Sequence, residues 1–384
     1  MKVIIIIKED IKLFPPVITL IQTIGRMGHK VIVVGHYSDL EQKEKYENEG
    51  VLFIETGFYD VNSSLLNKLK GNLLFRKRVK EILKKLNLNS DEDYCLWIMQ
   101  GLTISLLHNI ISEHPTVLHP LEFVDKDVKL FYRLLSPGYN AAKTYAKAKK
   151  VVNCEYNRAQ ILKGILNLEE LPEVLPNKMR YDESLFNNIP PEIQERVDCL
   201  KKRLEGKKVI LYQGIFVKRE RRLEEFCKAV KLLGKEYVLV IMGADNQEGY
   251  KELQHKFPNT QIVFIPFIKP PYHLLVTQMA HIGILTYFPR PDTFASVINP
   301  LYCAPNKIFE YGKFGIPMIG NDIPGLHYIF KEFNCGRTVS YPMTETKIKD
   351  AIESIFSDYE KYSIGAKDYF NSVDIPAIIK NILK

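Results

Sequence analysis

Residues 303–320 read CAPNKIFEYGKFGIPMIG. This pattern predicts a loop, a short helix that begins near Asn306, and a buried strand after Gly315. Asn306 is a favourable N-cap residue, and the free N–H groups at a helix start favour a phosphate group. Lys307 in the first turn adds a positive charge. Glu310 lies one turn further on, where its carboxylate can accept hydrogen bonds from the two hydroxyls of a ribose. A solvated helix start, with Glu310 merely favouring the helix dipole, remains the alternative interpretation.

Short apolar runs and amphipathic stretches alternate on both sides of this segment. A strand, a helix and a strand are expected at 3–7, 15–27 and 30–35, and further strands at 51–54, 94–99, 116–119 and 150–153. A second series of strands is expected at 208–212, 237–242, 261–265, 281–285 and 317–319. Alternating strands and helices favour parallel, doubly wound sheets. The sequence therefore predicts an α/β fold with two Rossmann-like domains.

The domain boundary is expected in the proline-containing segment LPEVLPN at 171–177. We therefore predict a first domain at 1–173, completed by a C-terminal helix at about 365–384, and a second domain at 174–364. Ligands of such folds bind at the carboxyl ends of the strands. The predicted site is a central cleft that the two domains face.

The opening residues and the cysteines restrict the class of protein. Residues 1–8 hold too few apolar side chains for a signal peptide core or a membrane span, which predicts a cytoplasmic location. The six cysteines show no CxxC pair and no histidine at zinc-site spacing, so reduced thiols are expected. No metal ion and no cofactor are expected.

Much of the formal net charge of +8 is concentrated between residues 68 and 85, where eight Lys or Arg stand against the single acid Glu81. Leucines and other apolar residues are interleaved with them. The pattern fits a solvated helix or attachment to an anionic membrane surface. Nucleic acid has no supporting fold module. The residues expected at the membrane surface are Lys77, Arg78, Lys80, Lys84 and Lys85.

The string PNKIFEYGKFGIPMIG resembles the PNK-hydrophobic-FEY-x3-G-x-P motif in bacterial members of the retaining GT-B glycosyltransferases of family 4. The run VILYQG at 209–214 is similar to the strand-then-glycine opening of the donor domain in that family. The resemblance spans nearly the whole chain and implies a GT-B fold. It also implies that Glu310 holds the ribose of a nucleotide-sugar donor and that Asn306 and Lys307 lie at its diphosphate.

The resemblance implies further donor contacts after the first strand of the second domain. Gly214 ends this strand, and the loop IFVKRERR at 215–222 carries four basic residues. A diphosphate leaving group needs cationic partners because negative charge builds on it. Register with the family favours Arg221 first and Lys218 second, with a solvated helix start as the alternative.

Three other residues are candidates for contact with the sugar. In LHPLE at 118–122, His119 and Glu122 resemble the family's histidine and glutamate at a strand end. The resemblance implies that His119 is a catalytic residue that contacts a sugar hydroxyl or the transferring region, although a lone histidine there is often structural. The family places a glutamate eight positions before Glu310, where this chain has Tyr302. This departure affects recognition of the sugar ring.

The resemblance implies transfer of a sugar, of the hexosyl or hexosaminyl class, from a nucleotide-sugar donor with retention. A UDP-sugar is favoured as donor. The acceptor is expected to be a glycan or a polyprenyl-diphosphate-linked sugar in surface polysaccharide biosynthesis, at the inner face of the plasma membrane. A nucleotide-sugar epimerase and a catalytically inactive GT-B scaffold are the alternatives. A nicotinamide oxidoreductase is disfavoured because no G-x-G-x-x-G follows a predicted strand.

Overall fold

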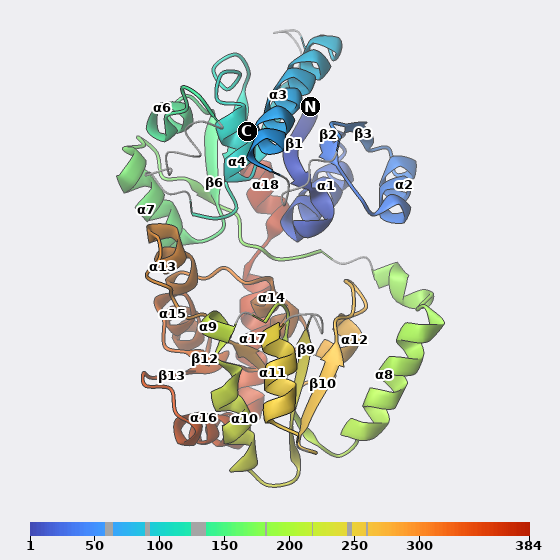
Figure 1. Cartoon of the computed structure of the whole chain (residues 1–384), viewed down its shortest axis with the longest axis vertical. Helices are drawn as coiled ribbons and strands as arrows, with labels where there is room; N and C mark the ends of the chain where they lie inside the picture. The colour runs from blue at the N-terminus through green and yellow to red at the C-terminus, as the bar shows by residue number, and fades with distance from the viewer. Residues whose placement is uncertain are drawn as a thin grey trace. The chain divides into compact units, whose positions relative to one another are not determined.

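The computed structural model describes residues 1–57, 64–88, 93–123, 136–180, 183–216, 218–243, 248–258 and 260–384. The chain divides into two compact units (Figure 1). The first comprises Met1–Asn177 and Asp374–Lys384, and the second comprises Lys178–Val373. The predicted boundary at 173/174 lies four residues before the observed division. Within the described residues, no helix combines the length and the apolar character needed to cross a bilayer.

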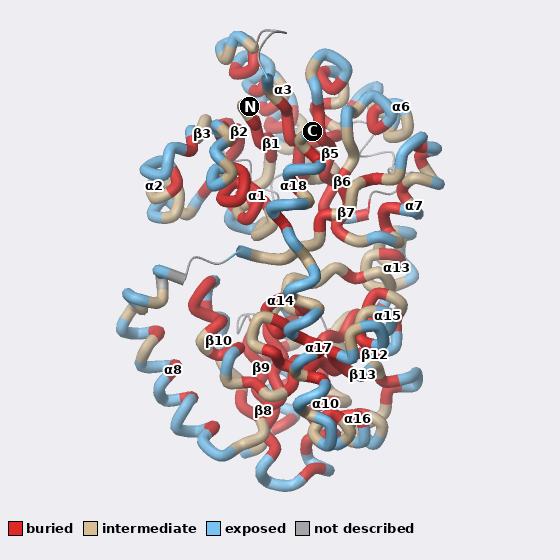
Figure 2. Tube along the Cα trace, turned by 180° about the vertical axis from the view of Figure 1, so that it is seen from behind, coloured by how far each residue is buried: buried red, intermediate tan, exposed pale blue. Residues whose placement is uncertain are grey.

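The first unit is built on a seven-stranded sheet of order β3-β2-β1-β4-β5-β6-β7, in which every pairing is parallel. The strands are β1 (Lys2–Asp10), β2 (Lys30–His36), β3 (Leu52–Glu55), β4 (Tyr94–Met99), β5 (Thr116–His119), β6 (Lys150–Asn153) and β7 (Glu173–Val174). The central strand β1 carries a continuous apolar run at residues 3–7 that is 0% exposed, as expected for a parallel strand covered on both faces (Figure 2).

Helices connect these strands, together with a 3-10 turn at Ile11–Leu13. They are α1 (Pro15–Arg26), α2 (Leu40–Asn48), α3 (Leu65–Lys85), α4 (Gly101–Leu106), α6 (Ala141–Tyr145), α7 (Tyr156–Leu166) and α18 (Ile375–Leu383). The segment expected to be only a linker contains β7, which extends the sheet by pairing with β6.

The second unit has a six-stranded parallel sheet of order β10-β9-β8-β11-β12-β13. Its strands are β8 (Lys208–Gln213), β9 (Tyr237–Gly243), β10 (Ile262–Pro266), β11 (Ile282–Leu285), β12 (Met318–Asn321) and β13 (Gly336–Val339). The prediction of two doubly wound, Rossmann-like sheets is confirmed. The prediction lacked β13. The order reverses between β8 and β11, which is where ligands of such sheets bind.

The helices of the second unit are α8 (Pro191–Leu204), α9 (Lys218–Arg221), α10 (Leu223–Lys231), α11 (Glu248–Lys256), α12 (Leu274–Thr277), α13 (Phe294–Leu301), α14 (Asn306–Lys313), α15 (Pro324–Phe333), α16 (Glu345–Ser357) and α17 (Tyr359–Ser372), with a 3-10 turn at Glu183–Asn187. The single C-terminal helix expected at about 365–384 is two helices. Helix α17 belongs to the second unit, and α18 begins after Asp374, whose Oδ1 accepts from the N–H of Ala377 at 3.1 Å.

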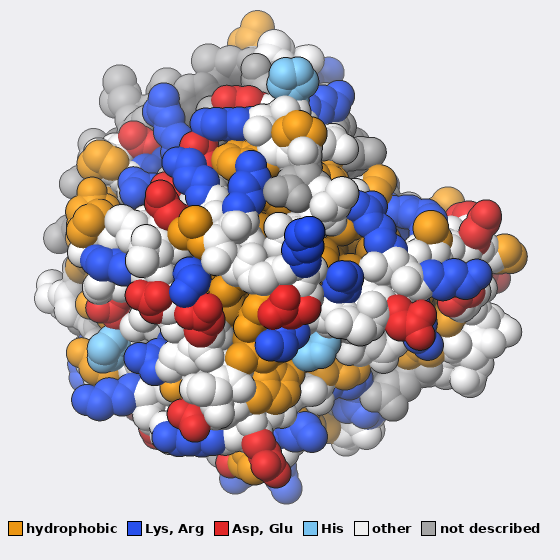
Figure 3. All heavy atoms as spheres, turned by 90° about the horizontal axis from the view of Figure 1, so that it is seen from below, with side chains coloured by type: hydrophobic (Ala, Val, Ile, Leu, Met, Phe, Trp, Pro, Cys, Tyr) orange, Lys and Arg blue, Asp and Glu red, His pale blue; other side chains and the backbone are white. Residues whose placement is uncertain are grey.

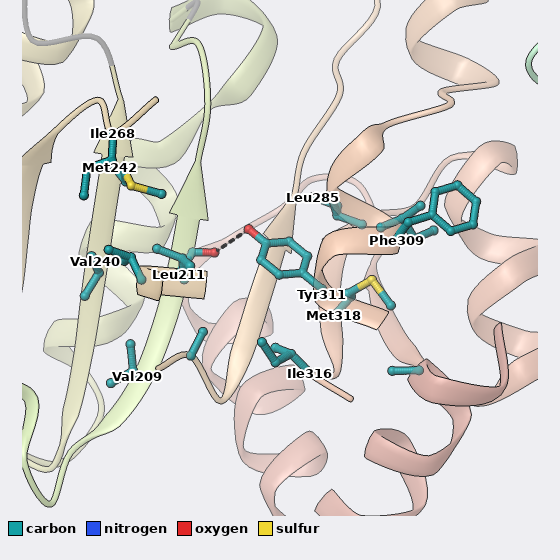
Figure 4. Packing of buried hydrophobic residues seen from close by; sticks show 14 of the residues in the cluster. Val209, Leu211, Val240, Met242, Ile268, Leu285, Phe309, Tyr311, Ile316 and Met318 are labelled. Carbon is teal, nitrogen blue, oxygen red and sulfur yellow. Dashed lines mark hydrogen bonds between the residues drawn. The ribbon is translucent and has the colours of Figure 1, made fainter. Parts of the chain in front are cut away.

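Close packing fixes helix α14 against the centre of the second sheet (Figure 4). The hydroxyl of Tyr311 donates to the carbonyl oxygen of Leu211 on β8 at 3.1 Å. Gly283 on β11 makes room for the same ring, because a Cβ there would lie 2.4 Å from it. On the far side of α14, a Cβ at Gly312 would lie 2.8 Å from the carbonyl oxygen of Ala366 on α17. The start of α14 is thereby held at the end of β8.

Candidate functional site

The end of strand β8 leaves a space that a side chain would fill. Gly214 follows the strand with φ of +121°, a conformation that favours glycine. Its N–H donates to the carbonyl oxygen of Met242 at 2.9 Å, which ties it to β9. A Cβ on Gly214 would stand 2.9 Å from Nζ of Lys307. The glycine therefore allows the Lys307 ammonium to lie against the backbone at the strand end.

Helix α14 begins one residue earlier than the sequence predicted. Pro305, with φ of −77° and ψ of 138°, occupies the N-cap position, and Asn306 is the first helical residue. The prediction of Asn306 as the N-cap is wrong because the extended backbone of Pro305 sets the start of the helix. The Pro305 side chain makes no capping hydrogen bond at this end. The N–H groups of the first turn therefore keep their capacity to bind an anion.

Lys307 and Arg221 lie against the same aromatic ring. The Arg221 guanidinium carbon is 4.7 Å from the centre of the Tyr287 ring, and Nζ of Lys307 is 5.9 Å from that centre and 4.9 Å from the centre of the Tyr212 ring. Removal from water and then the Arg221 charge lower the pKa of Lys307 to about 7, while Glu310 acts in the opposite direction. An anion between the two cations would relieve their repulsion.

Backbone and side-chain contacts fix Arg221 at the end of α9. Its carbonyl oxygen accepts from Oγ1 of Thr286, which follows β11, at 2.6 Å. Glu220 is shared, because its Oε2 lies 3.7 Å from Arg221 and its Oε1 lies 3.0 Å from Nε of Arg290. The buried Nε of Arg221 has no acceptor among the described residues. Arg221 therefore keeps hydrogen-bonding capacity for a ligand.

Glu310 is a buried carboxylate, 7% exposed, within a polar network. Gln213 at the end of β8 donates from Nε2 to Oε2 of Glu310 at 2.5 Å. Nε2 of His273 lies 3.2 Å from the other oxygen, Oε1. Oγ1 of Thr277 donates to Oε1 of Gln213 at 2.7 Å. A short polar chain thus joins β8, α12 and α14 around the carboxylate.

The sequence reasoning did not single out several of these residues. The sequence gives only a weak indication that Gln213 belongs to the site, because it is a polar residue at the end of an apolar strand and directly before a glycine. Tyr212 and Tyr287 fit core positions, and nothing in the local sequence of His273 connects it with Glu310. These residues come from separate strands and helices, so only the fold brings them together.

The structure describes fewer contacts for two candidates in the second unit, Lys218 and Tyr302. Lys218 begins α9, but its side chain lies outside the described residues. Tyr302 ends helix α13, where its N–H donates to the carbonyl oxygen of Ile298 at 3.0 Å, and its side chain is half-buried.

In the first unit, His119 ends strand β5 opposite Met99 of β4. Its ring is 1% exposed, and burial lowers the pKa of the imidazole to about 3, so the ring is neutral at pH 7. Neither ring nitrogen has a hydrogen-bond partner within the described part of the chain. Glu122 is exposed, after a turn in which Leu121 has φ of +64°.

The basic segment forms helix α3, in which Phe75, Val79, Ile82 and Leu83 are buried. All five predicted membrane-surface residues on it are exposed: Lys77, Arg78, Lys80, Lys84 and Lys85. A cavity of about 580 Å³ lies between this helix and β3 and includes three of these cations together with Glu55 and Glu81. On the face seen in Figure 3, by contrast, Lys and Arg are mixed with Asp and Glu.

Comparison with known proteins identifies relatives of the fold and of the second unit. Residues 200–367 match the family described as glycosyl transferases group 1. A glycosyltransferase from Rickettsia africae is 14% identical, with a TM-score of 0.69 over 99% of this chain and 96% of that chain. The Anabaena protein HepE, solved with UDP and glucose, is 12% identical with a TM-score of 0.67 over 100% and 98%. The UDP-GlcNAc 2-epimerase from Neisseria meningitidis, bound to UDP-GlcNAc, is 13% identical with a TM-score of 0.60 over 100% of both chains.

No protein of curated function matches the sequence. At these identities, the likeness to solved structures defines the fold, which is GT-B. The family match lies within the second unit and contains Gly214, Arg221, Lys307 and Glu310. It supports glycosyl transfer as the activity of this chain.

Proposed function

We propose that this protein transfers a sugar from a nucleotide-sugar donor, with a UDP-sugar favoured, to a sugar hydroxyl on an acceptor, with retention. The family match on residues 200–367 supports the reaction class. UDP in the HepE structure and UDP-GlcNAc in the epimerase structure support a uridine diphosphate donor. The transferred group is of the hexosyl or hexosaminyl class.

The observation that carries this proposal is the pairing of Lys307 with Arg221 at the end of β8. Holding two cations together and partly out of water is unfavourable, as the lowered pKa of Lys307 reflects. A donor diphosphate would offset this cost by supplying negative charge. The position of the Lys307 ammonium against Gly214 and the start of α14, where Pro305 provides no capping side chain, support the same ligand.

The chemistry follows from this charge distribution. The bond between the anomeric carbon and the diphosphate oxygen breaks, and negative charge grows on the departing diphosphate. Arg221, Lys307 and the N–H groups at Asn306 stabilise that charge, with Lys218 as an additional cation. The acceptor hydroxyl attacks from the face that the diphosphate leaves, and the departing phosphate takes its proton. Glu310 holds the ribose.

The contacts to the transferred sugar are proposed for His119, Glu122 and Tyr302. The neutral ring of His119 has one donor and one acceptor nitrogen, and both lack a partner within the described residues. This capacity suits a sugar hydroxyl. The proposal for Glu122 rests on the resemblance to the family. The proposal for Tyr302 rests on its position, where the family has a glutamate.

The proposed acceptor is a glycan or a polyprenyl-diphosphate-linked sugar at the inner face of the plasma membrane, in surface polysaccharide biosynthesis. The exposed cations and leucines of α3 support peripheral attachment of a cytoplasmic enzyme. Leu66, Leu73 and Leu74 are 77%, 62% and 44% exposed.

The donor site is tested by thermal unfolding with UDP, GDP, ADP and CMP over a concentration series. A ligand that binds the native state raises the midpoint with concentration. We expect UDP to stabilise the wild type and the exposed-surface control Lys331→Ala, and to lose this effect in Glu310→Ala. If no nucleotide stabilises the wild type, the donor-site assignment is wrong.

Turnover then separates the remaining alternatives. Release of UDP that depends on an added acceptor supports the transferase. A change in sugar configuration without an acceptor would instead indicate an epimerase. Nucleotide binding without turnover of any donor would indicate an inactive scaffold.

A further inference from the structure

We propose that Gln213, His273 and Thr277 are positioning residues that hold the Glu310 carboxylate ready for both ribose hydroxyls, and so make the site selective for ribonucleotides over 2′-deoxyribonucleotides. This inference rests on the proposed function, because it assumes that Glu310 faces a nucleotide. It adds three positioning residues and a preference for ribonucleotides to that function.

The first step is the orientation of the Gln213 side chain. A carboxylate only accepts, so the amide nitrogen of Gln213 faces Glu310 and its amide oxygen faces α12, where Oγ1 of Thr277 donates to it at 2.7 Å. The amide nitrogen is then directed at Oε2 of Glu310, to which it donates at 2.5 Å. Thr277 thereby holds the Gln213 side chain that contacts Glu310.

The second step is the contact on the other carboxylate oxygen. Nε2 of His273 lies 3.2 Å from Oε1 of Glu310. His273 and Thr277 are joined by the first turn of α12, where the N–H of Thr277 donates to the carbonyl oxygen of His273 at 3.0 Å. Because different side chains contact the two oxygens, the carboxylate is restrained from rotating about its last bond.

The third step is the consequence for the ligand. A carboxylate has about four acceptor positions on its two oxygens. A restrained carboxylate can accept from the 2′- and 3′-hydroxyls together. A 2′-deoxyribose satisfies only one of these positions, and an unsatisfied buried acceptor is costly. A carboxylate without the restraint turns toward whichever hydroxyl is present and discriminates less.

This role is separable from the diphosphate contacts, which are proposed for Arg221 and Lys307. Loss of the restraint on Glu310 should therefore weaken UDP binding while leaving 2′-deoxy-UDP and inorganic pyrophosphate unaffected. A merely structural role would weaken all three ligands by a similar factor.

The experiment measures dissociation constants of UDP, 2′-deoxy-UDP and pyrophosphate by calorimetry, with the matched GDP and ADP pairs alongside. We expect the wild type to prefer UDP by about tenfold or more, the effect of one hydrogen bond to a charged group. His273→Ala and Thr277→Val should reduce this preference at least threefold through lost UDP affinity. His273→Gln should restore it, because its amide offers a donor in place of Nε2–H.

A matched control is His327→Ala, which removes a histidine paired with Asp322 at 2.8 Å on the surface of the same unit. It should leave all three constants unchanged. Equal weakening of UDP, 2′-deoxy-UDP and pyrophosphate in Thr277→Val, or an unchanged preference, would overturn the inference even if His273→Ala fails to fold. Failure of the wild type to bind any ribonucleotide would instead overturn the proposed function, and this inference with it.

Discussion

The Nζ atom of Lys307 occupies the space beside Gly214 in which a side chain would begin, since a Cβ there would lie 2.9 Å from that nitrogen. The two residues are far apart in the sequence and meet where β8 ends and α14 begins. This proximity places a cation against backbone at the switch point of the second sheet, and it makes residue 214 a sensitive position for the proposed donor binding.

Gly214→Ala is expected to weaken nucleotide binding by displacing Lys307. The φ of +121° adds backbone strain, with a cost of about 1–3 kcal/mol in the free energy of unfolding. Gly206→Ala is the matched control, because Gly206 has φ of +69° and nothing within 4 Å of the added carbon. Urea unfolding should show destabilisation of both variants, whereas UDP titration should show reduced affinity in Gly214→Ala alone. Equal UDP affinities of Gly214→Ala and Gly206→Ala would contradict the proposed displacement of Lys307.

Lys307→Met is expected to change stability and binding in opposite directions. The folded state lowers the pKa of this lysine from 10.5 to about 7, so folding disfavours its charged form at neutral pH. Removal of the charge should raise the unfolding midpoint of the free protein and abolish the further increase caused by UDP. Lys331→Met on the exposed face of α15 should do neither. A lower unfolding midpoint for ligand-free Lys307→Met than for the wild type would contradict the interpretation that the Lys307 charge destabilises the free protein.

Donor affinity should depend on pH through the same lysine. Binding of a diphosphate favours charged Lys307 and raises its pKa, so affinity should be constant well below pH 7. Above pH 7 it should fall as the free protein loses the proton, by up to about tenfold per pH unit. Tyr212, whose pKa burial raises to about 12, stays neutral in this range. UDP-glucose is the suitable ligand, since its diphosphate has no ionisation near neutrality. Lys307→Arg should bind without this dependence, because arginine remains charged.

Tyr311→Phe is expected to destabilise the second unit by about 1–3 kcal/mol, because the buried carbonyl oxygen of Leu211 loses its hydroxyl partner. Tyr328→Phe, at a side chain that is 65% exposed, should be neutral. Urea unfolding of both variants measures the difference. A neutral Tyr311→Phe would mean that packing against Gly283 alone holds α14.

Replacement of the α3 cations Lys77, Arg78, Lys80, Lys84 and Lys85 by glutamate should abolish binding to vesicles that contain anionic phospholipid. Each cation near such a surface contributes about 1 kcal/mol. Binding of the wild type should weaken as salt rises. The control replaces Lys201, Lys202 and Arg203, which are exposed on α8. Retention of vesicle binding by the α3 variant, or equal loss in both, would contradict a specific role for α3.

Much of the fold could be predicted from local patterns. The apolar runs that became β1, β8 and β9 are long and bounded by turn signals. Strands β8 and β9 begin and end within one residue of the expected positions, whereas β1 continues three residues past its expected end. The run at β13 is short and contains an exposed Arg337, which obscured it. The break between α17 and α18 was missed because the amphipathic pattern continues past Ser372, whereas Asp374 begins a new helix.

The candidate site could be predicted only in part. Lys307 and Glu310 stand in one motif, so the sequence alone fixed their spacing, their chemistry and the helix that carries them. The partnership of Glu310 with Gln213 and His273, and that of Lys307 with Arg221 and Gly214, depends on contacts between residues far apart in the chain. Such contacts follow from strand order and helix packing, which local periodicity does not encode. The tertiary structure alone therefore decided which side chains share a low-dielectric environment, and with it the pKa of Lys307 and the restraint on Glu310.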